Sequence, residues 1–364
     1  MKILAIDTAC DETSAAVTEN TTILSNIIWS QASLHAKWGG ILPSLAQREH
    51  LKRIDWVVKK ALDTSHQSLT SDIDAIAVTV GPCLAIAGEV GIAKAKELAK
   101  KYDKPLVAVN HIEGHVLSPL AQPRTENPKF EIRNSKLTIR FPALGLVISG
   151  GHTDLILIKE IGQYKLLAQT RDDALGEALD KAARMLGLGY PGGAILEKMA
   201  QHGNPNSYPL PIPMSGREKE GYFSYSGLKT AMWKIVEAEK KKGKELLTKK
   251  QIENLAASFQ NTAFEHLTRV ISSIIHNSSF VIHDLLVGGG VSNNIEIRKR
   301  LRKMAKQFGI KVCLPYTKKL CSDNAAMIDV AAYFKSKEGK FVKNIAKVER
   351  LPRSKIGETF PWEI

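Results

Sequence analysis

Two histidines stand four residues apart in the segment His111-Ile-Glu-Gly-His115. If this segment is helical, both imidazoles point to one side of the helix, about one turn apart. Two imidazoles placed in this way can bind one metal ion. The segment follows an apolar run typical of a strand, and α/β sheets bind their ligands at the carboxyl ends of strands. The residues alone leave two interpretations open: a metal site, or two histidines that cap or pack.

A third ligand could come from Asp323, which stands at the expected start of a helix in the sequence Cys-Ser-Asp-Asn. A short acidic side chain at that position either caps the helix or binds a cation. Glu113 lies two residues after His111, which is about 200° around a helix. It would point away from a metal held by the histidines, so the segment lacks the general base of the His-Glu-x-x-His metallopeptidases.

Glycine-rich turns separate apolar segments at Gly150-Gly151, Gly192-Gly193 and Gly288-Gly289-Gly290. Backbone N–H groups in such turns can bind phosphate. The last turn has the best context, because it follows a strand-like segment and precedes a helical one. Neither G-x-G-x-x-G nor G-x-x-x-x-G-K-[S/T] occurs in the chain, so Rossmann and P-loop sites are excluded. A nucleotide site and three plain turns stay open as interpretations.

Three acidic residues, Asp7, Asp11 and Glu12, crowd the first expected turn of the chain. Paired acids in a turn that faces a cleft suit cation binding or proton transfer. The alternative is a polar hairpin turn with no chemical role.

The charge balance points to an anionic partner. Lys and Arg number 51 against 37 Asp and Glu, which leaves a net charge of +14. Basic residues cluster at 234–250 and 298–319. A Lys or Arg that meets a phosphate releases condensed counterions, so such surfaces favour nucleic acid. The alternative is a solvated basic helix face.

Composition limits the class of protein. With 44% hydrophobic and 24% charged residues, the chain is of the ordinary globular type. No apolar run reaches the roughly 18 residues of a membrane span, and the first residues make a poor signal peptide. The four cysteines, Cys10, Cys83, Cys313 and Cys321, show no C-x-x-C spacing. We expect reduced thiols in a cytoplasmic protein.

The elements that must position these residues alternate between strand and helix, which predicts an α/β fold with a largely parallel, covered sheet. A strand–turn–strand pattern opens the chain at residues 2–18 and returns at residues 143–159. Asp7 and Ser149 hold matching places in the two copies. At about 100–200 residues per domain, the 364 residues suggest two domains built on one plan.

Several segments, taken in order, resemble the TsaD family of tRNA adenosine threonylcarbamoyltransferases, formerly labelled O-sialoglycoprotein endopeptidases. The resemblance spans nearly the whole chain. Within the family, the arrangement of these segments is similar to that of the bacterial or organellar branch. The segments are IDTACDET, LHAKWGGILPSLAQREH, HIEGH, SGGHT, DDALGEALDKAARMLGLGYPGG, FSYSGLKT, GGGVSNN and SDNAAMI.

The resemblance implies two actin-like, Hsp70-like ATPase (ASKHA) domains with a cleft between them. We expect an N-terminal lobe of residues 1–121 plus about 325–364, an inserted basic loop at 122–142, and a C-terminal lobe of residues 143–324. The implied reaction moves the threonylcarbamoyl group from threonylcarbamoyl-AMP to the exocyclic amine of the adenosine 3′ of the anticodon in ANN-decoding tRNAs. AMP is released.

The resemblance also assigns roles to individual residues. The implied ligands of one divalent metal ion, iron or zinc, are His111, His115 and Asp323. The implied substrate-binding residues are Ile148, Ser149, Gly150, Gly151, His152, Asp180, Gly193 and Asn294. A base must remove a proton from the amine, and our hypothesis for it is Asp11 or Glu12.

The implied partners are tRNA, a TsaB-like paralogue, a TsaE-like ATPase and a TsaC/Sua-type synthase that supplies the adenylate; a homodimer that works alone is the alternative. Other classes stay open: a non-catalytic partner subunit of the same fold, a metallopeptidase, and a sugar kinase or ATPase. The chain departs from the usual family pattern at Asp7-Thr8-Ala9-Cys10, at Gly81-Pro82-Cys83 and at residues 43–48. The expected metal and nucleotide positions are intact.

Overall fold

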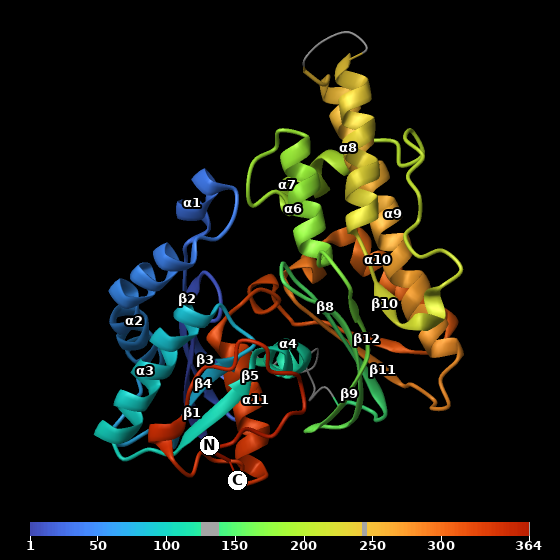
Figure 1. Ribbon diagram of the computed structural model, residues 1–364. Helices are drawn as coiled ribbons and strands as arrows, with labels where there is room; N and C mark the ends of the chain where they lie inside the picture. Colours follow the sequence, from blue (N-terminus) through green and yellow to red (C-terminus); the bar gives the residue numbers. More distant parts are fainter. Residues whose placement is uncertain (125–137, 242–245, 364) are drawn as a thin grey trace.

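A computed structural model describes residues 1–124, 138–241 and 246–363. It contains two six-stranded sheets that lie side by side, each with helices on its outer face (Figure 1). Within the described residues, no helix is long and apolar enough to cross a membrane.

The first sheet is mixed, because a β-hairpin is joined to parallel strands. β1 pairs antiparallel with β2 and parallel with β4. In the hairpin Ile6 lies opposite Ala15 and Asp7 opposite Ser14. The strand order is β5 (Leu106–Asn110), β4 (Ala75–Gly81), β1 (Lys2–Asp7), β2 (Glu12–Glu19), β3 (Thr22–Ser30) and β6 (Gln122–Pro123).

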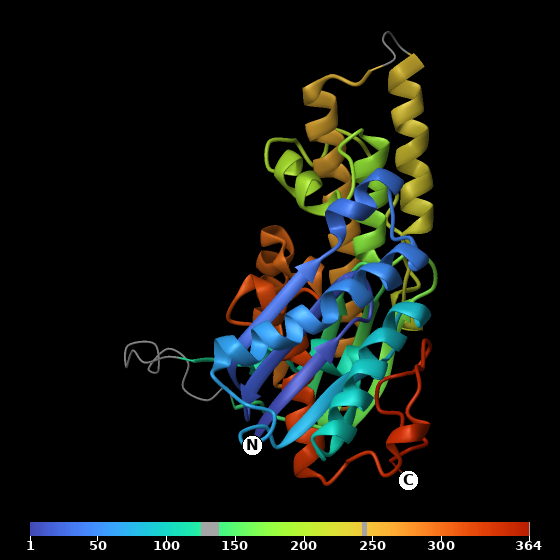
Figure 2. The ribbon, with the colours of Figure 1, turned by 90° about the vertical axis from the view of Figure 1, so that its left-hand side faces the viewer.

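Alternate residues of β1 face the two sides of this sheet, as strand geometry requires. Leu4 and Ile6 share a core with α2 (Pro43–Ser65). Helix α3 (Ala85–Lys101) belongs to the same core, and Figure 2 views the molecule from the side of these two helices. Ile3 and Ala5 face the opposite core, which contains residues of α4 (His111–Leu117) and α11 (Ala325–Lys337). The chain after α11 returns to the first sheet, where Phe360 and Trp362 are buried.

The second sheet repeats the plan of the first. Its hairpin, β7–β8, pairs Ile148 with Thr153, and β7 is parallel to β11. The strand order is β10 (Tyr222–Phe223), β9 (Gln163–Thr170), β8 (Thr153–Glu160), β7 (Ala143–Ile148), β11 (Asp284–Gly288) and β12 (Lys311–Cys313).

Five helices cover the outer face of the second sheet within the described residues (Figure 1). They are α6 (Leu175–Met185), α7 (Gly193–Ala200), α8 (Ser226–Lys241), α9 (Lys249–His276) and α10 (Ile295–Gln307). Leu144 and Leu146 of β7 face these helices. Val147 faces the core that contains α4 and α11, so those two helices lie between the sheets.

Short helical segments complete the described chain. They are α1 (Ala32–His35) and the 3₁₀ turns η1 (Ala36–Trp38), η2 (Ser118–Leu120), η3 (Glu218–Glu220), η4 (Gly290–Asn293), η5 (Lys318–Leu320) and η6 (Ile345–Lys347).

The α/β class and the repeated hairpin are as predicted, but the expectation of a largely parallel sheet is only half right. Hairpin strands β2, β3, β8 and β9 pair antiparallel in both sheets. The short strand β12 and the half-exposed β9 were not predicted, since neither has a long apolar run. Of the expected inserted loop, residues 125–137 lie outside the described residues. The lobe boundaries stay a prediction.

Candidate active site between the two sheets

Helix α4 carries both histidines of the predicted pair and begins directly after strand β5. The Asn110 side chain caps this helix by accepting hydrogen bonds from the backbone N–H groups of Ile112 and Glu113. The cap fixes where the first turn starts. His111 and His115 consequently lie on one face of the helix, with ring centroids 4.7 Å apart.

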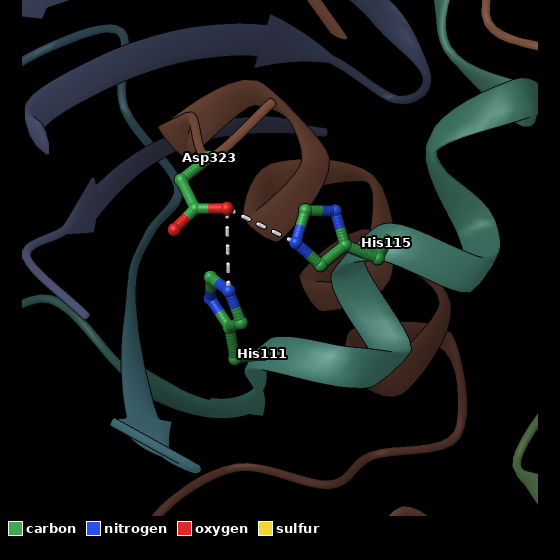
Figure 3. A group of neighbouring side chains, drawn as sticks. All are labelled: His111, His115 and Asp323. Carbon is green, nitrogen blue, oxygen red and sulfur yellow. Dashed lines mark hydrogen bonds and ion pairs between the residues drawn. The ribbon is translucent and has the colours of Figure 1, made fainter. Parts of the chain in front are cut away.

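Asp323 approaches the same point from the segment before α11, as Figure 3 shows. Its Oδ1 lies 3.1 Å from Nε2 of His115 and 3.6 Å from Nε2 of His111. One ligand atom from each of the three side chains lies within 4.8 Å of the others. The two imidazole nitrogens and the carboxylate oxygen match the donor set of zinc and of non-haem iron, so the residues fit a divalent metal ion.

Charge in this cluster is set by burial and by the close carboxylate. Burial opposes ionisation of Asp323, but His111 outweighs it and holds the pKa of the carboxyl well below its ordinary value. Burial alone would lower the pKa of His111, yet Asp323 raises it to about 9. Burial lowers the pKa of His115. The site therefore presents an ionised carboxylate and a neutral His115 imidazole, the forms in which both ligate metals, and a protonated His111 whose proton a bound metal ion would displace.

The alternative reading of Asp323 as a helix cap is wrong. Asn324 is the residue that caps α11, because its side chain accepts a hydrogen bond from the backbone N–H of Met327. The Asn324 amide also donates to the carbonyl of Ser322 at 2.7 Å. The cap thus frees the neighbouring Asp323 side chain for the cluster.

Glu113 faces away from the two histidines, as the sequence predicts. Its carboxylate accepts a hydrogen bond from the Tyr164 hydroxyl at 2.9 Å. Burial raises the pKa of Glu113, and the ammonium of Lys335 only partly offsets that rise. A water held at the histidines would not meet this carboxylate, so the geometry gives no support to a metallopeptidase.

The cluster opens into a cavity of about 840 Å³ that residues of both sheets and their helices line. Most of the residues predicted from the sequence meet on its wall. They are Asp11, Glu12, His111, Ser149, Gly150, Gly151, His152, Asp180, Gly193, Asn294 and Asp323.

Two predicted residues do not line the cavity. His115 is fully buried behind the wall and reaches the cluster only through Nε2. Ile148 ends strand β7, and its side chain is part of the hydrophobic core. Any contact of Ile148 with a substrate would have to come from its backbone.

The turn between β7 and β8 leaves an open backbone surface. Ser149 and His152 close the turn, since the Ser149 N–H donates to the His152 carbonyl and the His152 N–H to the Ser149 hydroxyl. No atom lies within 4 Å of a Cβ built on Gly150 or Gly151. Burial lowers the pKa of His152 to about 4, with the His111 charge adding to the effect. The turn can therefore admit a bulky anionic group beside a neutral imidazole.

Asp180 fixes a second glycine turn at the same cavity. Its Oδ1 accepts hydrogen bonds from the backbone N–H groups of Gly192, at 2.9 Å, and Gly193, at 2.7 Å. Burial raises the pKa of Asp180, although both hydrogen bonds counteract the rise. Asn294 caps α10 with its side-chain oxygen and donates its amide to Gln260.

In the third glycine turn, Gly288-Gly289-Gly290, close packing explains the glycines better than phosphate binding does. A Cβ on Gly288 would lie 2.1 Å from the His115 carbonyl oxygen, and one on Gly289 would lie 2.4 Å from that of Ile148. Gly289 also has a φ of +87°, which glycine adopts without strain. Only Gly290 of the three lines the cavity.

The two acids of the first hairpin turn are half-buried and line the cavity. Burial raises the pKa of Asp11, and the charge of Asp323 adds to it. Burial raises the pKa of Glu12 well above its ordinary value, with the Asp11 charge as the next cause. Glu12 also accepts a hydrogen bond from the Ser30 hydroxyl at 3.1 Å. A raised pKa lies closer to neutral pH, where a carboxyl can both accept and release a proton, and this suits proton transfer.

The cavity wall includes residues that sequence reasoning did not single out. Arg184 and Tyr190 line it, and burial raises the pKa of Tyr190 to about 12. Gly39 leaves room for the Arg184 guanidinium, which would lie 3.1 Å from a Cβ at that position. Arg184 and Tyr190 belong to the motif DDALGEALDKAARMLGLGYPGG. The many polar positions of this motif were the feature of the sequence that could have indicated them as site residues.

Comparison with known proteins now decides the family. The family model of TsaD, described as tRNA N6-adenosine threonylcarbamoyltransferase, matches residues 22–330. The chain belongs to the TsaD family. It is 42% identical over 334 residues to the tRNA N6-adenosine threonylcarbamoyltransferase of Rippkaea orientalis, covering 91% of this chain and 90% of the relative.

A second relative with the same description comes from Bartonella henselae; it is 42% identical, with 91% of this chain and 89% of the relative covered. Among solved structures, full-length HypF in a phosphate- and nucleotide-bound form matches with a TM-score of 0.57 at 13% identity. That match covers 92% of this chain and 55% of HypF. The likeness concerns the fold alone, and it agrees with the predicted ASKHA architecture of this TsaD-family chain.

Proposed function

We propose that this chain transfers the threonylcarbamoyl group from threonylcarbamoyl-AMP to the exocyclic amine of the adenosine 3′ of the anticodon in ANN-decoding tRNAs. Family membership supports the reaction class. The observation that carries the proposal for this chain is the meeting of three elements on one cavity wall. They are the His111–His115–Asp323 cluster, the open turn at Gly150 and Gly151, and the Asp180 turn.

The donor would lie along the cavity with its phosphate beside the turn of Ser149, Gly150 and Gly151. Its ribose would lie at Asp180, and its adenine beside Gly193 and Asn294. Support comes from the lining of one continuous cavity by all these residues. The imidazole of His152 would complete the phosphate end, and Ile148 directly precedes the turn with its side chain in the core.

In the reaction, the adenine nitrogen forms a bond to the carbamoyl carbon while the bond from that carbon to the phosphate oxygen breaks. The amine is a weak nucleophile, so the anhydride must supply the driving force and AMP must leave. Backbone N–H groups of the open turn would offset the charge that develops on the carbonyl oxygen. Such interactions would strengthen once the bound substrates displace water from the cavity, because less solvent then competes for the donors.

We propose that His111, His115 and Asp323 hold one divalent metal ion, iron or zinc. Their donor set and their 4.8 Å grouping support this assignment. When bound, such an ion would supply a Lewis acid for phosphate and carbonyl oxygens. Asp7 lies behind this cluster, with its Oδ2 3.9 Å from Nδ1 of His111.

We propose that Asp11 or Glu12 accepts the proton of the amine. Burial raises the pKa of both carboxyls, and the charge of Asp323 adds to the rise at Asp11 and that of Asp11 to the rise at Glu12. The ionised form that acts as a base therefore gains population as the pH rises. We expect the single-turnover rate of transfer to rise as the pH passes through the raised pKa of the carboxyl that acts as the base. We expect Asp11→Ala or Glu12→Ala to lower the rate by about 100-fold or more, in line with general base catalysis.

Rapid-quench assays with saturating adenylate and tRNA would measure that rate across pH. Ser30→Ala is the matched control, because it leaves both carboxyls in place while it removes the hydrogen bond to Glu12 and the one that the Ser30 hydroxyl accepts from the Ala32 N–H. If both alanine variants kept the full rate, neither acid would be the base.

The proposed partners are tRNA, a TsaC/Sua-type synthase that makes the adenylate, and a TsaB-like paralogue with a TsaE-like ATPase. A homodimer that acts without the helpers is the alternative arrangement. We propose the cytoplasm as the compartment, since tRNA is the substrate and the four cysteines are unpaired.

The decisive experiment is reconstitution from the purified chain, threonylcarbamoyl-AMP and an ANN-decoding tRNA transcript, with and without the helper proteins. Nucleoside mass spectrometry should detect threonylcarbamoyladenosine, together with one equivalent of AMP per modified base. A transcript with guanosine in place of the acceptor adenosine is the control. No modified nucleoside under any combination would refute the proposal.

A further inference from the structure

A second hollow of about 680 Å³ lies on the outer side of the second sheet, away from the lining of the active-site cavity. Residues of η3, α9 and α10 form its walls (Figure 1 shows α9 and α10). We call it the α9–α10 groove; its lining residues are Gly216, Glu218, Lys219, Thr268, Arg269, Ser272, Ser273, Glu296, Lys299, Arg300, Lys303, Met304 and Gln307.

The acids of the groove are already neutralised by its arginines. Arg269 pairs with Glu218 at 2.9 Å, and Arg300 pairs with Glu296 at 2.8 Å. Arg300 also donates to Asn261. These pairs hold the walls together and leave no unmatched negative charge among the lining residues.

Three lysines of the groove have no ion pair with any described residue: Lys219, Lys299 and Lys303. All three are exposed. Lys299 and Lys303 lie one turn apart on α10, about 6 Å along its axis. The groove therefore presents three free positive charges to solvent, and an anionic ligand could bind them without breaking an existing pair.

Neutral hydrogen-bonding groups stand between the charges. Ser272 and Ser273 of α9 are half-buried in the groove, and Gln307 ends α10. Hydroxyl and amide side chains, together with lysines, supply most protein contacts to nucleic-acid phosphates and sugars. An RNA backbone would use both kinds of group, with phosphate oxygens at the lysines and sugar oxygens and hydroxyls at the serine and glutamine side chains.

Helix α10 connects this groove to the active-site cavity. Its cap, Asn294, lines the cavity, and the helix then runs to Gln307 in the groove. Arg298, in the first turns of α10, folds back on the protein by donating to the carbonyl of Ser292. In the first part of the predicted basic cluster at residues 298–319, Arg298 and Arg300 are thus engaged within the protein. Lys299, Arg302 and Lys303 are exposed and form no ion pair with a described residue.

We propose that the α9–α10 groove binds the sugar-phosphate backbone of the tRNA whose anticodon-loop adenosine enters the cavity, with Lys219, Lys299 and Lys303 as the phosphate contacts. This inference rests on the proposed function for the identity of the RNA. RNA is the occupant that the observations favour, because free positive charge and hydroxyl groups coincide on a groove formed by the same helix, α10, whose cap lines the cavity.

The test compares two triple variants that each remove three positive charges. Lys219→Gln, Lys299→Gln and Lys303→Gln empty the groove of free cations. Lys59→Gln, Lys60→Gln and Lys165→Gln are the matched control, at exposed lysines outside the groove. Binding of the full-length chain to an ANN-decoding tRNA transcript would be measured by filter retention from about 50 to 200 mM salt, the range over which phosphate contacts change affinity strongly.

We expect the groove variant to bind tRNA about tenfold or more weakly at 100 mM salt. The slope of log affinity against log salt should fall by about three, or one per lost phosphate contact. The control variant should keep most of the slope. An equal slope in the groove variant and the wild type would overturn the proposal and leave the groove to an acidic protein.

A second measurement depends neither on the variants folding nor on catalysis. Acetylation of the wild-type chain, read by mass spectrometry, should show Lys219, Lys299 and Lys303 protected by tRNA while Lys59 and Lys60 stay reactive. Equal acetylation with and without tRNA would also overturn the proposal. Failure of the proposed function would look different, because tRNA would then protect the groove although no modified adenosine forms.

Discussion

At the residue scale, the site depends on a few side chains whose ionisation is set by burial. Asp323 stays ionised because His111 is close to it, although burial raises the pKa of the carboxyl. His115 is fully buried beside them. Burial deprives the carboxylate and the two imidazoles of hydrogen bonds to water. A bound divalent ion would compensate for this loss of solvation.

We predict that His111→Ala, His115→Ala and Asp323→Ala each weaken metal binding by about 100-fold or more. Loss of an outer partner of a metal ligand costs about 10–100-fold, and loss of a ligand itself should cost more. Metal content after dialysis against a graded chelator would measure the effect. His202→Ala, at an exposed histidine, is the control. A variant that keeps one equivalent of metal would remove that residue from the ligand set.

At the element scale, helix α11 positions Asp323 and closes the face of the first sheet toward α4. Its cap is Asn324, and most of its residues are buried. One of them, Asp329, carries a carboxyl that has no place in the proposed chemistry. Burial raises the pKa of Asp329 well above its ordinary value, and the Ala5 backbone lowers it only in part.

This buried carboxyl predicts a pH-dependent stability. Because its folded pKa is raised, the folded state holds the proton more tightly than the unfolded chain, whose pKa is about 3.9. The contribution of Asp329 to stability is complete below that pH and is lost as the pH rises through the folded pKa. Within that interval the free energy of unfolding should fall by about 1.4 kcal/mol per pH unit relative to Asp329→Asn.

Urea unfolding of the wild type and of Asp329→Asn at several pH values would measure the difference. Asp63→Asn, at an exposed aspartate of α2, is the control for the loss of one negative charge. If the difference in the free energy of unfolding between the wild type and Asp329→Asn did not change with pH, Asp329 would not hold its proton on folding.

At the scale of the whole molecule, the two sheets meet through the helix that carries the histidines. Val116 of α4 packs against Gly145 of β7, where a Cβ would lie 3.0 Å from its side chain. The end of β11 is even closer, because Gly288 lies against the His115 carbonyl. The second sheet therefore fixes the position of His115, a proposed metal ligand on a helix that follows the first sheet.

We predict that Gly288→Ala disturbs the metal cluster without touching any ligand. The new Cβ would lie 2.1 Å from the His115 carbonyl oxygen, so the helix or the strand must shift. We expect metal affinity to fall by about tenfold or more, as for outer partners of metal ligands. Gly227→Ala is the control, since no atom lies within 4 Å of its Cβ position.

Chelator competition would measure the affinity, and circular dichroism would establish that both variants are folded. If Gly288→Ala bound metal as tightly as the wild type, contact between the sheets would not position the site.

The sequence by itself determined the alternation of elements, the repeated hairpin and the side chains available for chemistry. Helical spacing alone put His111 and His115 on one side and turned Glu113 away, because a local periodicity fixes the direction of side chains on a helix. The motifs also indicated the family, which the comparisons then established.

The tertiary structure decided what depends on contacts between distant parts of the chain. It brought Asp323 to the histidines 208 residues away from His115 and made Asn324 the cap. It gave Gly288 and Gly289 a packing role, and it separated the engaged Arg298 from the free Lys299 and Lys303. Spacing along the chain carries no information about such encounters, because they arise only when separate elements pack together.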